Sequence, residues 1–153
     1  MGCGMKIKNI VLGFIALLSV GCATGPKYII PKGTDVDNLA QIYIYRTDVA
    51  FGSLNPEKPF FYIDGKEVGK LGTGQSVFTM VVPGRHKISV KKSFLFMPGA
   101  DGEEINLVFE PKEKYYLRYS EEFSGLTMVG TTAVAAGNSS FTLANKELFE
   151  QKK

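Results

Sequence analysis

Short runs in which apolar and polar side chains alternate recur along the chain from residue 39 onward. In residues 41–46, Ile42 and Ile44 face one way, and Tyr43 and Tyr45 face the other. Such a period of two, with β-branched and aromatic residues, is typical of a β-strand. Further strand-like runs follow at residues 60–63, 66–69, 76–82, 85–91, 104–109 and 115–120. These runs predict about six short strands.

Turn-forming residues separate these runs. Asp64-Gly65 lies between two of them and predicts a hairpin with a type I′ turn, in which both central residues have positive φ. Pro83-Gly84 suits a type II turn and predicts a second hairpin, between 76–82 and 85–91. Residues 92–102 interrupt the alternation and are expected to form an irregular connection.

These elements predict an all-β fold, a small antiparallel β-sandwich that occupies residues 39–153. Residues 125–137 are apolar and small, and are compatible with either a strand or a packed irregular segment. Residues 145–151 predict a short C-terminal helix, with Asn145 as its N-cap and with Leu148 and Phe149 docking on the domain.

The first 21 residues have the pattern of an export signal, which would form an N-terminal signal helix. Lys6 and Lys8 precede an apolar run that is shorter than the ~20 residues of a membrane-spanning helix. The run ends in residues 19–22, Ser-Val-Gly-Cys, which resemble a lipobox although Ser19 replaces its usual leucine. We therefore expect acylation of Cys22. An uncleaved signal anchor, or cleavage elsewhere with Cys22 as an ordinary thiol, is the alternative.

Residues 22–38 are rich in Gly, Pro and Asp and are expected to form a flexible tether behind the lipidated cysteine. Ala23 stands where an aspartate would resemble an inner-membrane retention signal. The expected location is therefore the cell envelope, at the periplasmic side of the outer membrane. The expected partners are the membrane, through acyl chains on Cys22, and an envelope protein.

Net charge and cysteine content exclude some partners and some kinds of site. Removal of Lys6 and Lys8 with the signal lowers the formal net charge from +3 to +1. Because no basic stripe remains, a nucleic-acid partner is not expected. Cys3 and Cys22 are the two cysteines of the chain, so the domain would contain neither a disulfide nor a thiolate metal site.

Catalytic chemistry has little support in the sequence. His86 is the single histidine, and its position in the alternation predicts a hydrogen-bonded residue at the edge of the core. One histidine cannot supply a usual zinc site, and the acidic residues, such as Asp101, Glu103 and Glu104, lack the spacing of an EF-hand. We expect no enzyme, no catalytic residues, no metal and no cofactor.

Two groups of side chains are candidates for recognition. Exposed aromatic rings can stack on a sugar or a peptide, although tyrosines more often line the half-exposed face of a sandwich. The candidate ligand face consists of Tyr43, Tyr45, Tyr62, Tyr115 and Tyr119. An apolar loop can contact a partner, or it can cover an open end of the sandwich. The candidate contact surface consists of Phe94, Leu95, Phe96 and Met97.

The order of several short motifs carries a resemblance to a known family. These motifs are Ile-Tyr-Ile-Tyr-Arg at 42–46, Asp-Gly-Lys at 64–66, the glycine-rich step to Phe78, Pro-Gly-Arg-His at 83–86 and the tyrosine pair at 115–116. Together they resemble short bacterial lipoproteins of the family catalogued as domain of unknown function 2846. The resemblance implies a PEGA-like or transthyretin-like β-sandwich on a lipid tether, without assigned catalytic residues.

The sequence thus predicts an envelope lipoprotein whose β-sandwich is a non-catalytic interaction or assembly module. The alternative is a lipoprotein that binds an envelope glycan or peptide through a tyrosine-rich sheet face.

Overall fold

The computed structural model describes residues 26–48, 58–94, 96–129 and 131–151. The described chain is mostly β-strand, with a short 3-10 helix before the first strand and one α-helix after the last. The elements, in chain order, are η1 (Val36–Asn38), β1 (Ala40–Arg46), β2 (Phe60–Ile63), β3 (Lys66–Lys70), β4 (Ser76–Val81), β5 (Gly84–Phe94), β6 (Met97–Phe109), β7 (Lys114–Val129), β8 (Thr132–Ala144) and α3 (Lys146–Glu150).

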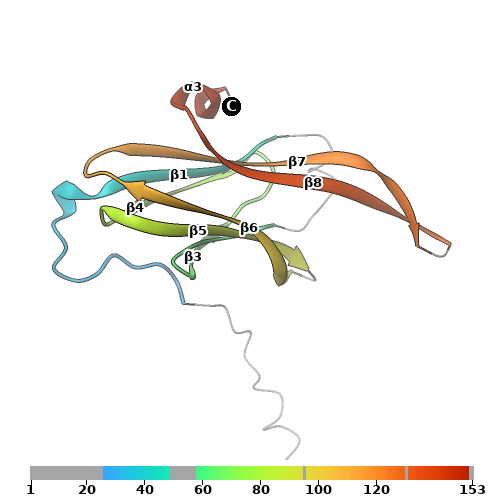
Figure 1. Ribbon diagram of the computed structural model, residues 1–153, viewed down its shortest axis with the longest axis horizontal. Coiled ribbons are helices and arrows are strands. Elements are labelled where there is room, and N and C mark those ends of the chain that lie inside the picture. The colour runs from blue at the N-terminus through green and yellow to red at the C-terminus, as the bar shows by residue number, and fades with distance from the viewer. Residues whose placement is uncertain (1–25, 49–57, 95, 130, 152–153) are drawn as a thin grey trace, which may run out of the picture.

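The strands form two four-stranded sheets, and the all-β class that the sequence predicts is confirmed. The first sheet has the order β4-β1-β7-β8 and the second has the order β3-β2-β5-β6. In Figure 1 the two sheets lie over one another as layers, with α3 on the far side of the first sheet. All named strand pairs are antiparallel except β1 and β7, which run parallel.

The core lies between the sheets and follows the predicted alternation. Ile42 and Ile44 of β1 and Ile88 and Val90 of β5 are at most 1 % exposed. Their neighbours in the core include Phe61, Ile63, Phe109, Leu117 and Tyr119. Burial of each such side chain contributes about 1.5–3 kcal/mol. This core stabilises the sandwich.

The two predicted turns have different outcomes. Asp64 and Gly65 have φ of 51° and 74°, and they join β2 to β3, which pair antiparallel. This hairpin is confirmed. The second hairpin is wrong, because β4 pairs with β1 in the first sheet whereas β5 pairs with β2 and β6 in the second. The segment with Pro83 therefore connects the two sheets instead of forming a hairpin.

The irregular connection predicted at residues 92–102 is also wrong. β5 continues to Phe94 and β6 begins at Met97, so the two strands form a long hairpin with a tight end. The register shifts between Lys91 and Ser93, and this irregularity breaks the period of two that sequence patterns depend on.

Residues 125–137, for which the sequence left a strand or an irregular segment open, are strand on both sides of a second long hairpin. The pairing of β7 with β8 begins at Tyr116 and Ala144 and continues to Val129 and Thr132. The partner strand β1 accompanies β7 only as far as Tyr119. Figure 1 shows the remainder of β7 and β8 projecting beyond the end of the sandwich.

The predicted C-terminal helix is confirmed as α3. The side-chain oxygen of Asn145 accepts a hydrogen bond of 2.9 Å from the backbone N–H of Leu148, as an N-cap does. Phe149 docks on the first sheet, whereas Leu148 remains 42 % exposed.

Residues 26–38, predicted to belong to the tether, follow the surface of the domain. The N–H of Tyr28 donates to the carbonyl of Glu67, and the N–H of Glu67 donates to the carbonyl of Pro26, both at 2.8 Å. Tyr28 also packs against the core. Residues 26–28 of the predicted tether therefore form a short strand-like segment along the edge of β3.

Candidate functional site

The five tyrosines of the candidate ligand face do not share one face. Tyr43 and Tyr45 lie on the outer side of the first sheet, because they alternate with the buried Ile42 and Ile44. Tyr115 and Tyr119 pair with the inward-facing residues of β1 and contribute to the core. Tyr62 belongs to β2 in the other sheet and is 6 % exposed. The grouping is thus corrected, because strand parity and pairing separate residues of the same type.

Aromatic rings do gather on the outer side of the first sheet, beneath α3. The ring of Tyr43 lies 5.1 Å from that of Tyr116 and 4.9 Å from that of Phe78. Phe149 of α3 lies 5.3 Å from the ring of Tyr45 and 5.5 Å from that of Tyr43. These contacts attach α3 to the sheet, while Phe78 remains 47 % exposed.

The candidate contact surface lies at the end of the β5–β6 hairpin. Phe96 is 68 % exposed and Met97 is 60 % exposed, so neither side chain covers the core. The side chain of Phe94 and all of Leu95 lie outside the described residues. Phe96 has a φ of 63°, in the left-handed region, which costs a residue with a side chain about 1–2 kcal/mol. The hairpin therefore holds an exposed aromatic ring at an unfavourable backbone angle.

His86 has the predicted position at the edge of the core. Its Nδ1 lies 2.7 Å from the Asp64 carboxylate, and its Nε2 lies 2.8 Å from the carbonyl of Val82. The imidazole ring stacks on Phe109 at 5.6 Å. Each ring nitrogen thus lies within hydrogen-bond distance of an acceptor of the same chain, so the ring is engaged within the protein and not directed at a substrate. The histidine holds the segment between the sheets against the β2–β3 turn.

Asp64 accepts hydrogen bonds in this turn. Burial raises the pKa of the Asp64 carboxyl, but the backbone N–H of Lys87 and the side chain of His86 favour the charged form and lower the pKa overall. The carboxylate therefore fastens the turn to β5.

Asp64→Asn is expected to destabilise the protein at neutral pH by less than about 1 kcal/mol, because the Asp64 side chain is 43 % exposed and solvent screens its charge. A lowered folded-state pKa contributes stability above the unfolded-state pKa of about 3.9, and this contribution disappears as the pH falls through the folded-state value. In urea unfolding, the difference between wild type and variant should therefore shrink below about pH 4. A difference that grows on acidification would contradict this assignment.

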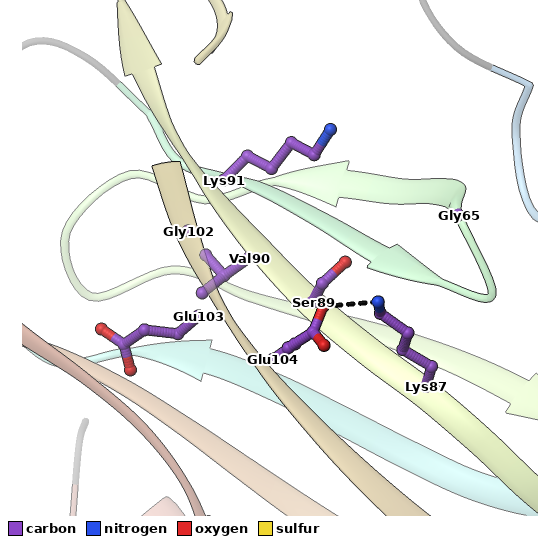
Figure 2. Close-up of a pocket in the computed structure, with 8 residues that line it drawn as sticks. All are labelled: Gly65, Lys87, Ser89, Val90, Lys91, Gly102, Glu103 and Glu104. Atoms are coloured by element: carbon purple, nitrogen blue, oxygen red, sulfur yellow. Dashed lines mark ion pairs between the residues drawn. The ribbon is translucent and has the colours of Figure 1, made fainter. Parts of the chain in front are cut away.

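A shallow cavity of about 350 Å³ lies beside the β2–β3 turn. It is lined by parts of β5, β6 and this turn, namely Gly65, Lys87, Ser89, Val90, Lys91, Gly102, Glu103 and Glu104. Figure 2 shows Lys87 paired with Glu104, while Lys91 and Glu103 point away in opposite directions. The Nζ of Lys91 lies 5.5 Å from the ring of Tyr62. These polar groups do not converge on a common point, and we assign no catalytic role to them.

Within the described residues, no cluster of three or more histidine, cysteine, aspartate or glutamate side chains could hold a metal ion. Glu103 and Glu104 are neighbours on β6 and pair with different residues, Val90 and Ser89, so they lie on opposite faces of the strand. The arrangement gives no support to a calcium site at these residues.

A buried polar network that the sequence analysis missed lies where the β7–β8 hairpin leaves the sandwich. Arg46, the last residue of β1, is 1 % exposed and faces the interior like Ile42 and Ile44. Its Nη1 donates to the carbonyl of Leu71 at 3.2 Å, and its Nη2 donates to Glu121 at 2.5 Å. The hydroxyl of Tyr119 donates to the other Glu121 oxygen at 2.8 Å. We refer to Arg46, Tyr119 and Glu121 as the interior network.

The interior network keeps Tyr119 protonated. Burial raises the pKa of the Tyr119 hydroxyl strongly, and the negative charge of Glu121 and the hydrogen bond to it raise it further. Tyr119 is thus a hydrogen-bond donor at any physiological pH and not a base. Since Arg46 balances the charge of Glu121, the network stabilises the base of the hairpin and has no free reactive group.

Cys22, the candidate lipidation site, lies outside the described residues. The part of the chain that the structure describes contains no helix of the length and apolarity required to cross a membrane.

The comparisons with known proteins identify a family. Neither the curated proteins nor the solved structures contain a match to this chain, so the PEGA-like or transthyretin-like comparison stays a prediction. The family model described as "Protein of unknown function (DUF2846)" matches residues 36–134, from η1 into β8. This range covers most of the two sheets, and it includes the motifs at 42–46, 64–66 and 83–86. The chain therefore belongs to the DUF2846 family.

Proposed function

We propose that this chain is a bacterial envelope lipoprotein, anchored through acyl chains on Cys22, whose β-sandwich is a non-catalytic interaction or assembly module. The observation that carries the proposal is the end of the β5–β6 hairpin, where Phe96 and Met97 are exposed. A large apolar side chain that does not contribute to the core gains stability only when a partner covers it. The proposed location is the periplasmic side of the outer membrane.

The backbone of Phe96 adds support for a contact role. A positive φ at a bulky residue is uncommon and persists where the surrounding structure enforces it. Glycine would adopt this angle without a penalty, yet the position carries phenylalanine. An exposed ring retained at the expense of backbone energy favours recognition over folding as the reason for this residue.

Phe96→Gly is expected to leave the free energy of unfolding unchanged or to raise it by up to about 1 kcal/mol, because it removes strain and no buried contact. In intact cells, photo-cross-linking from Met97 followed by mass spectrometry should recover an envelope protein in wild type and lose it in the variant. Val108→Ser, which removes another exposed apolar side chain from β6, serves as the matched control and should retain the cross-link.

Two outcomes would contradict this contact role. Destabilisation by Phe96→Gly would indicate that the ring packs within the protein. Failure to recover any protein neighbour in repeated cross-linking would remove the assembly module and favour the alternative function.

Cells grown with an alkyne fatty acid are expected to label the wild-type chain and to leave Cys22→Ser unlabelled, because the thiol is the proposed attachment point. Cys3→Ser is the matched control and should keep its label, since Cys3 belongs to the proposed signal peptide. Label that persists in Cys22→Ser would overturn the anchor.

The alternative is a glycan- or peptide-binding lipoprotein that uses the aromatic rings outside the first sheet. Its support is narrower than the sequence suggested, because Tyr43 shares this surface with Phe78 and Tyr116, whereas Tyr115 and Tyr119 are in the interior. Aromatic faces stack on sugars and peptides, and Phe78 has an exposed ring beside the stacked pair. The proposed ligand surface is accordingly this smaller aromatic group.

A further inference from the structure

The four outer edges of the two sheets differ in how they are protected against pairing with another strand. An open edge presents unpaired N–H and C=O groups, and proteins normally cover it, shorten it or place charges and proline on it. The edge of β3 is partly covered by residues 26–28, which make backbone hydrogen bonds to Glu67. The edge strand β4 has six residues. β6 carries Pro98 and three acidic residues, Asp101, Glu103 and Glu104.

Among the described residues, β8 is long and carries neither proline nor charge, although part of it lies close to β6. It is the last strand of the first sheet and pairs with β7 on one side only. It has 13 residues, without proline or a charged side chain. The uncharged stretch extends from Phe123 through Asn145, so it includes the distal part of β7 as well. Exposed apolar side chains lie along the same hairpin, with Met128 63 % exposed and Leu143 54 % exposed.

We propose that β8 is a self-association edge, at which a second copy of this chain adds its own β8 in antiparallel orientation about a two-fold axis. Self-pairing brings a strand of the same length against the open edge, so the main-chain groups exposed along it find partners. Because β8 carries no charge, no register of this pairing places like charges opposite each other. On β6, by contrast, self-pairing near the acidic residues would bring carboxylates together.

The pairing would join the two first sheets into one continuous sheet of eight strands, with the order β4-β1-β7-β8 followed by its mirror sequence in the second copy. Self-association names a second copy of the chain as one partner of the proposed assembly module. Its role in the envelope rests on that proposed function. The pairing itself does not require a lipid, and it uses a different part of the molecule from Phe96 and Met97. The two proposals can therefore fail separately.

The test is a cysteine scan in intact cells, with one substitution at a time along β8 of the full chain. A residue on the two-fold axis lies opposite its own copy, within the Cα separation of about 4.4–6.8 Å that a disulfide requires. A position two residues away lies about 13 Å from its own copy, at 3.3 Å per residue. Mild oxidation should thus convert most of the chain to dimer at one position, and at least tenfold less at positions two residues away.

Asn106→Cys on β6 is the matched control, since it places an exposed cysteine on the opposite sheet. Wild type, with Cys3 and Cys22 only, controls for the native thiols. In parallel, sedimentation of the detergent-solubilised full chain should give twice the protein mass of one copy. A scan with no preferred position, equal dimer formation at Asn106→Cys, or one copy per particle at all concentrations would overturn the self-association. Recovery of other envelope proteins through Met97 would leave the assembly role standing in each of these cases.

Discussion

Glu121→Gln is expected to destabilise the protein by about 3 kcal/mol. The substitution removes the carboxylate that binds the buried Arg46 guanidinium, and removal of one partner of a buried ion pair typically costs about 3–5 kcal/mol. The lower end applies because the Glu121 side chain is 15 % exposed, whereas that of Arg46 is 2 % exposed. Urea unfolding followed by far-UV circular dichroism measures the change.

The neighbouring residue supplies the matched control. Glu122→Gln removes the same charge from an exposed position on the same strand and should change the free energy of unfolding by less than about 0.5 kcal/mol. Replacement of both charged partners, Arg46→Met with Glu121→Leu, should recover part of the loss, because no charge then remains buried at this position. Equal effects of Glu121→Gln and Glu122→Gln would show that the interior network does not stabilise the fold.

Local patterns predicted which face of β1 is buried, but apart from the β2–β3 hairpin they did not predict which strands pair. The alternation in β1 assigned Ile42 and Ile44 to one face, and both are fully buried. The turn at Pro83 was interpreted as a hairpin because a Pro-Gly pair favours a tight reversal. Such a turn equally allows the chain to change sheets, and the choice depends on β1, whose contacts with β4 lie some 35 residues apart in sequence.

The candidate site was less predictable, since residues were grouped by type instead of by parity. Tyr43 and Tyr115 belong to strands of the same sheet, but their faces are opposite once the pairing of β1 with β7 is known. The interior network had one sequence signal, because Arg46 shares the parity of Ile42 and Ile44. Its partner Glu121 is 75 positions away. Only the parallel register of β1 and β7 brings the two side chains together.

Gly102→Ala is expected to destabilise the protein by about 3 kcal/mol, because the backbones of β5 and β6 approach closely at this position and leave no room for a methyl group. A Cβ atom on residue 102 would lie 1.9 Å from the carbonyl oxygen of Val90 and 3.1 Å from the Cα of Lys91. Contacts between carbon and oxygen are normally 3.3 Å or longer, so the strands would have to separate. The effect is steric, since Gly102 is not among the glycines with positive φ.

Asn106→Ala, a substitution at an exposed position on the same strand, is the matched control and should change the free energy of unfolding by less than about 0.5 kcal/mol. Unchanged stability of Gly102→Ala would show that the two strands can move apart at low cost.

Gly102 also affects the position of the hairpin end. It pairs with Lys91 immediately before the register shift, and Phe96 and Met97 lie beyond that shift. Gly102→Ala should therefore lose both stability and the cross-link from Met97, whereas Phe96→Gly loses the cross-link alone. This contrast separates the residues that position the hairpin end from the residue that makes the contact.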